Sequence, residues 1–124
     1  MSAALDIRAI IGLLDLTRLE KPDQPAAIRE LCQKAATPYG TVAAICVYPE
    51  FVSVVKECLP DPAIKIASVA NFPHGADSLA DTIATIEAAL KDGANEIDVV
   101  MPYQTYLAGD HQQAATFIQT CKSA

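Results

Sequence analysis

Short apolar segments alternate with amphipathic segments along the whole chain, and this alternation restricts the possible folds more than any other feature. The apolar segments span residues 13–17, 41–48, 64–70 and 96–101, which is strand length, and an amphipathic segment follows each of them. Consecutive strand–helix units without a hairpin signal predict a parallel sheet with right-handed crossovers. A further amphipathic segment at 3–11 predicts a short helix before the first strand.

Capping and breaking residues predict where the helices begin and end. Asp23 is expected to cap the helix after the first strand, and Pro49 is expected to begin the next helix. Ser78 starts a capping-box pattern, and Gly93 ends the helix that follows it. Asp110 is expected to cap a last helix that runs to the end of the chain.

A parallel sheet of this kind occurs in two architectures, the doubly wound open sheet and the closed barrel. The glycines form neither a GxGxxG nor a GxxxxGK[ST] pattern, so the nucleotide-binding forms of the open sheet are excluded. A (βα)8 TIM barrel needs about 250 residues and eight strands, and this chain has 124 residues. We therefore expect an α/β fold of four βα units, a single domain over residues 1–124 that is half of a TIM barrel.

Composition and charge exclude several classes of partner. The net charge is −6 and no run of Lys or Arg is present, so nucleic acid is not expected as a partner. The apolar segments are far shorter than the roughly 20 residues that span a bilayer, and the N-terminus lacks the pattern of a signal peptide. Four cysteines without CxxC spacing suit reduced thiols in the cytoplasm, and two histidines do not make a zinc site.

Three predicted strands carry a polar residue within an apolar run. Asp15 and Thr17 lie on one face of the first strand, Cys46 lies near the end of the second, and Asp98 lies in the fourth. A carboxylate in a dry interior costs several kcal/mol unless it is paired, so each Asp is either a satisfied structural group or part of a site. Two such carboxylates on one sheet favour a shared site, whereas Cys46 alone favours inert packing.

The loop NFPHG after the third strand is a weaker candidate. His74 could titrate near neutral pH, and Gly75 permits a close approach of the backbone. An ordinary βα turn, shaped by its Pro and Gly, is the favoured interpretation. His111 is expected on the solvated surface.

These residues lie in segments that resemble the deoxyribose-phosphate aldolase family. The matching segments are LLDLTRL around Asp15, TPYGTVAAICVYPEFV around Cys46, IASVANFPHG, and GANEIDVVMPY around Asp98, in the order and spacing of the family. The resemblance covers the chain from about residue 10 and implies the N-terminal half of the family's barrel.

The resemblance implies a class I aldolase that cleaves 2-deoxy-D-ribose 5-phosphate reversibly to D-glyceraldehyde 3-phosphate and acetaldehyde. It implies a Schiff-base lysine and neither a metal nor another cofactor. Asp98 would act in proton transfer with a second lysine and a water, Asp15 and Thr17 would line the substrate pocket, and Cys46 would lie beside it.

The family's two catalytic lysines and its phosphate-binding loops belong to later strands than those of this chain. The six lysines present fall on predicted helices and turns or, for Lys65, at the start of a strand. We therefore expect the isolated chain to be inactive. Its open strand edges predict a homodimer, or assembly with the missing C-terminal half. The alternatives are a non-catalytic, self-associating structural module and an unrelated small-molecule binder on an open α/β sheet.

Overall fold

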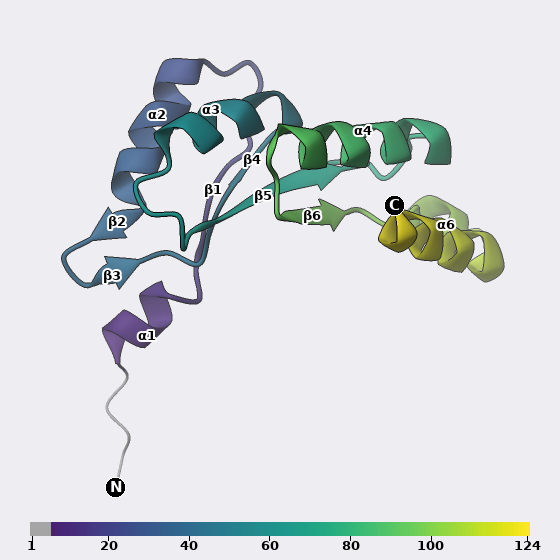
Figure 1. Ribbon diagram of the computed structural model, residues 1–124. Helices are drawn as coiled ribbons and strands as arrows, with labels where there is room; N and C mark the ends of the chain where they lie inside the picture. Colours follow the sequence, from purple (N-terminus) through teal and green to yellow (C-terminus); the bar gives the residue numbers. More distant parts are fainter. Residues whose placement is uncertain (1–5) are drawn as a thin grey trace, which may run out of the picture.

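A four-stranded parallel sheet forms the centre of the computed structural model, which describes residues 6–124 (Figure 1). The strands are β1 (Asp15–Arg18), β4 (Ala44–Val47), β5 (Lys65–Ala70) and β6 (Glu96–Val99). They pair in the order β1–β4–β5–β6, so each strand lies beside the next one along the chain. A doubly wound sheet reverses direction at a switch point. This one does not, and the order is that of consecutive barrel strands.

Helices follow the strands, as the alternating pattern predicts. They are α1 (Ile7–Ile11), α2 (Pro25–Lys34), the 3-10 helix η1 (Pro49–Phe51) that continues into α3 (Val52–Cys58), α4 (Leu79–Asp92), α5 (Tyr103–Leu107) and α6 (His111–Ser123). Among residues 6–124, no helix has the length and apolar character needed to cross a membrane.

The long helices cover a single face of the sheet. Ile45, Val47 and Ile66 point from the strands into a core shared with α2 and α3, where Ile28 and Val52 are fully buried. A second cluster joins the end of β5 to α4 and α6. The opposite face has its own small cluster, to which only strand and loop residues and Phe51 of η1 contribute: Ala44, Cys46, Tyr48, Ala67 and Val69, with Leu19, Phe51 and Phe72 at its margin. Long helices on one face, with strand and loop side chains on the other, are the arrangement of a barrel wall.

The segment from residue 36 to residue 47 differs from the prediction of one strand over 41–48. A small antiparallel hairpin, β2 (Ala36–Thr37) with β3 (Gly40–Thr41), precedes β4. The Thr37 hydroxyl donates to the Gly40 carbonyl at 2.8 Å and accepts from the Tyr39 N–H at 3.1 Å. Gly40 has φ +124°, a conformation that glycine adopts without strain. The predicted break at Thr37-Pro38-Tyr39-Gly40 is therefore a hairpin turn.

The expectation that Asp23 caps α2 is wrong. The helix begins one residue later, with Gln24 as N-cap and Pro25 in its first turn. Asp23 instead binds the guanidinium of Arg18 on β1, with Nε–Oδ2 at 2.6 Å and Nη2–Oδ1 at 3.0 Å. A bidentate pair to arginine holds this carboxylate more strongly than a helix N-terminus would, and it lowers the pKa of Asp23.

The other predicted caps are confirmed. The Ser78 side chain accepts from the Asp81 N–H, and the Asp110 side chain accepts from the Gln113 N–H, each at 3.0 Å. Gly93 ends α4 with φ +116°. The predicted N-terminal helix is present from residue 7, whereas residues 3–5 of that prediction lie outside the described residues. Helix α5 was not predicted, because its five residues carry no cap.

Candidate active site

The polar residues predicted from the strands all lie on the helix-free face of the sheet. Asp15 and Thr17 alternate with Leu16 and Arg18 along β1, and both are exposed. Asp98 is exposed on β6 between the half-buried Ile97 and Val99, which face the helices. The period of two along a strand thus puts the carboxylates on the face that a barrel encloses.

Cys46 lies at the centre of this face. It is in register with Thr17 on β1 and Ala67 on β5, and only 3% of its surface is exposed. Burial, and then the negative charges of Asp98 and Asp15, raise the pKa of its thiol to about 11, while a hydrogen bond with Thr17 partly offsets this rise. The thiol is therefore protonated at neutral pH. It is a small packing group and not an activated nucleophile.

The two carboxylates are not in contact. Asp15 lies on one edge strand and Asp98 on the other, with β4 and β5 between them. Asp15 is in register with Ala44 and through it with Lys65, whereas Asp98 is in register with Val69, four residues further along β5, so the two carboxylates are also displaced from each other along the strands. Both act on the thiol of Cys46, which stands between them. The structure thus places Thr17 beside Cys46, with one carboxylate on either side.

The loop NFPHG is a turn built around Asn71, in agreement with the favoured interpretation. Asn71 is buried, has φ +56°, and donates from its side-chain Nδ2 to the Val100 carbonyl at 2.8 Å. His74, the residue that made this loop a chemical candidate, is exposed, as is His111. Within residues 6–124, no three His, Cys, Asp or Glu side chains are grouped in a way that could hold a metal ion.

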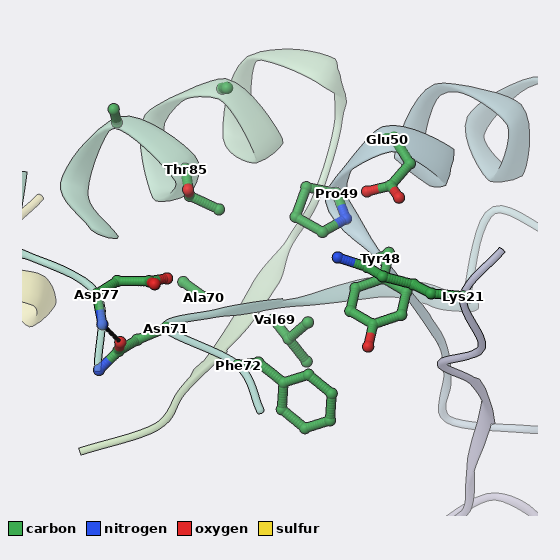
Figure 2. Close-up of a pocket in the computed structure, with 12 residues that line it drawn as sticks. Lys21, Tyr48, Pro49, Glu50, Val69, Ala70, Asn71, Phe72, Asp77 and Thr85 are labelled. Carbon is green, nitrogen blue, oxygen red and sulfur yellow. Dashed lines mark hydrogen bonds between the residues drawn. The ribbon is translucent and has the colours of Figure 1, made fainter. Parts of the chain in front are cut away.

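A cavity of about 540 Å³ at the carboxyl ends of β4 and β5 was not predicted (Figure 2). Lys21, in the loop after β1, lies at its edge with its Nζ 4.3 Å from the centre of the Tyr48 ring, a cation–π contact. The Tyr48 ring meets Phe72 edge to face, with 5.8 Å between ring centres. Asp77 and Thr85 also line the cavity, whereas none of the four predicted site residues does.

The sequence contained one signal for this cavity. Lys21 follows the end of the first strand, and loops at that end of a parallel sheet carry ligand-binding residues. Its direction, toward Tyr48 across the neighbouring strand, depends on a non-local contact. Lys65, by contrast, is exposed at the start of β5, the end opposite the cavity, as predicted.

Comparisons with known proteins bear on the family and the fold of the chain. The family described as DeoC/LacD family aldolase matches residues 9–124. A solved protein from Coccidioides immitis, assigned as a deoxyribose-phosphate aldolase, superposes with TM-score 0.88 at 26% identity, over 98% of this chain and 47% of that one. A structure described as an aldolase gives TM-score 0.82 at 20% identity, over 95% and 50%. The tetrameric deoxyribose phosphate aldolase of Aeropyrum pernix gives 0.66 at 21% identity, over 89% and 49%.

The last two likenesses establish the fold. The chain spans about half the length of each of these solved proteins. The family match extends over nearly all of the described residues and includes the three strands that carry Asp15, Cys46 and Asp98. The chain therefore belongs to the DeoC/LacD family of aldolases.

Proposed function

We propose that the chain is the N-terminal half of a Schiff-base aldolase that cleaves 2-deoxy-D-ribose 5-phosphate to D-glyceraldehyde 3-phosphate and acetaldehyde. The observation that carries the proposal is the position of Asp98, exposed on the helix-free face of a family-typical sheet. Asp98 supplies proton transfer, and Asp15 and Thr17 line the substrate pocket beside Cys46. The four thiols are free, which supports a reducing compartment such as the cytoplasm.

The positions of the lysines bear on which half of the barrel supplies the amine for the Schiff base. A Schiff base needs an amine aimed at the substrate carbonyl from the enclosed face of the barrel. Lys65 lies at the wrong end of β5, and Lys21 lies over Tyr48 at the rim of the cavity. As the family resemblance implies, we place the nucleophilic lysine and the phosphate site on the strands that complete the barrel, and we expect residues 1–124 alone not to turn over substrate.

A chimera tests this proposal. Residues 1–124 are fused to the complementary half of the Coccidioides immitis relative, and cleavage of deoxyribose 5-phosphate is followed by release of acetaldehyde. The fusion is expected to be active, and Asp98→Asn is expected to lower kcat/KM about 100-fold or more, the usual contribution of a general acid–base group.

The matched control is Asp92→Asn, which removes a carboxylate from the exposed end of α4 and is expected to leave the rate unchanged. A folded chimera without activity contradicts the proposal. So does a chimera in which Asp98→Asn and Asp92→Asn have equal rates.

A second candidate function is a self-associating structural module. Among the described residues, β1 and β6 have one strand neighbour each, and Leu13 and Leu14 beside β1 are 80% and 49% exposed. Such edges pair with other chains. Two copies joined β6 to β1 would make an eight-stranded ring with two-fold symmetry. Light scattering at micromolar concentration is expected to give the mass of a dimer, and a dispersed monomer contradicts this second candidate.

A further inference from the structure

An asparagine side chain closes the ladder between β5 and β6 at each end. At the start, the Asn95 N–H donates to the Ile66 carbonyl at 2.7 Å, and the Asn95 Oδ1 accepts from the Ile66 N–H at 2.9 Å. At the finish, the Val100 N–H donates to the Ala70 carbonyl at 3.1 Å, and the Asn71 Nδ2 donates to the Val100 carbonyl at 2.8 Å. Each side-chain amide thus replaces a main-chain rung of the parallel ladder.

The backbone conformation and the side-chain hydrogen bonds of Asn71 both suit its position at the end of β5. Its backbone turns away from the strand with φ +56°, a left-handed conformation that asparagine tolerates better than most residues. Its side chain is buried, and the Oδ1 that does not face Val100 accepts from the Asp77 N–H at 2.7 Å (Figure 2). A Cβ on Gly75 would meet the Met101 carbonyl oxygen at 2.8 Å. The loop after β5 therefore packs closely against the segment that follows β6.

Asp98 lies between these two closures, on a strand whose Ile97 and Val99 also favour this register by packing toward α4 and α6. Strand β6 has four residues, and within residues 6–124 it pairs with β5 alone. The side-chain period of a strand is two, so a slip of one residue would turn Asp98 toward α4 and α6 and bring Ile97 or Val99 to the helix-free face. The ends of a short edge strand are where such slips and fraying begin.

We propose that Asn71 and Asn95 are positioning residues that fix the register of β6 and so hold Asp98 on the helix-free face. The catalytic consequence of this proposal rests on the proposed aldolase function, whereas the claim that the two asparagines fix the register of β6 does not. The two residues use their amides differently. Asn95 contributes only an acceptor to Ile66, while Asn71 contributes both a donor to Val100 and an acceptor to Asp77.

This difference gives a test by conservative substitution. Asn95→Asp keeps the acceptor and is expected to match the unmodified chain, whereas Asn95→Leu removes it and speeds hydrogen exchange of the Ile66 amide about tenfold. Asn71→Asp sets a carboxylate oxygen against the Val100 carbonyl and is expected to speed exchange of the Val100 amide about as much. Asn71→Gly permits the left-handed backbone but lacks both hydrogen bonds, and it is expected to behave like Asn71→Asp.

Two nuclear magnetic resonance readouts on residues 1–124 decide the matter. Hydrogen exchange is measured along β5 and β6, with the amides of β4 as an internal reference that stays constant. The carboxyl carbon shift of Asp98 at fixed pH is expected to move in Asn71→Asp, Asn71→Gly and Asn95→Leu and to stay in place in Asn95→Asp.

Equal behaviour of Asn95→Asp and Asn95→Leu overturns the proposal, as does an Asp98 signal that is the same in all four variants. The Asn95 pair decides alone if an Asn71 variant does not fold. In the chimera, movement of the Asp98 signal together with an Asp98→Asn variant of full activity would refute the aldolase role and leave the positioning role standing.

Discussion

At the scale of single residues, the helix-free face combines one buried thiol with carboxylates that are not in contact. Cys46 is enclosed by its strand neighbours, and the charges of Asp98 and Asp15 both oppose its ionisation. A thiol with a pKa of about 11 is a poor nucleophile at neutral pH. Cys46 is therefore not assigned a nucleophilic role, and Asp98 is the proposed proton-transfer group of this face.

Burial first, and the charge on Asp98 second, are expected to slow the reaction of Cys46 with iodoacetamide. Because the pKa of the thiol is raised to about 11, little thiolate exists at pH 8, and labelling should accelerate as pH rises toward 11. Asp98→Asn removes a negative charge near the thiol, lowers the pKa of Cys46 and speeds labelling at pH 9 by a few-fold. Peptide mass spectrometry measures the rate.

Asp92→Asn serves as the control for this experiment, since that carboxylate is not among the causes of the Cys46 shift. Its labelling rate should equal that of the unmodified chain. Identical rates for Asp98→Asn and Asp92→Asn would show that the charge of Asp98 does not act on the thiol.

At the scale of elements, helix ends are defined by local hydrogen bonds and strand ends by tertiary pairing. The Ser78 hydroxyl oxygen accepts from the Asp81 N–H at 3.0 Å, and the Thr82 hydroxyl donates to the Ser78 carbonyl at 2.9 Å. Helix α4 packs on both β5 and α6 through Ile86. The cap at Ser78 therefore stabilises a helix that packs against β5 and β6.

Loss of the α4 cap is expected to destabilise the whole chain. Ser78→Ala leaves the N–H of Asp81 without its partner and should lower the free energy of unfolding by about 1 kcal/mol. Urea unfolding followed by circular dichroism measures the change. Ser53→Ala makes the same chemical change at an exposed position within α3 and is expected to alter stability by less than about 0.5 kcal/mol. Equal effects of the two substitutions would mean that the cap has no special role.

The elements that were predictable are those with local signals. The caps at Ser78 and Asp110 and the stop at Gly93 are encoded within a few residues, and the structure has all three. The hairpin around Tyr39 and the uncapped α5 have weak local patterns. Asp23 was misplaced because its partner, Arg18, lies on the preceding strand and competes with the helix N-terminus.

The residues of the candidate site also differ in whether the local sequence predicts them. Asp15 and Asp98 stand out in sequence, because a carboxylate is rare within an apolar strand. The cavity with Lys21 and Tyr48 does not, because it forms where the loop after β1 meets the ends of β4 and β5. The closures by Asn71 and Asn95 likewise depend on register between two strands.

At the scale of the whole molecule, the long helices of residues 6–124 pack on one face of the sheet, and the other face carries a small cluster of strand and loop residues with Phe51 of η1 (Figure 1). The chain spans about half the length of its solved relatives. The helix-free face would be the lumen of a complete barrel, and the open edges of β1 and β6 are where further strands would pair. On this account the chain contributes the carboxylates to the lumen, and the completing strands contribute the amine.

Borohydride trapping tests this central claim most directly. Residues 1–124 and the chimera are each incubated with deoxyribose 5-phosphate and sodium borohydride, and intact mass reports a reduced Schiff base. The account predicts a single adduct on the chimera, located in its completing half, and none on residues 1–124 alone. A stable adduct on the isolated chain, at Lys21 or any other lysine, would contradict it.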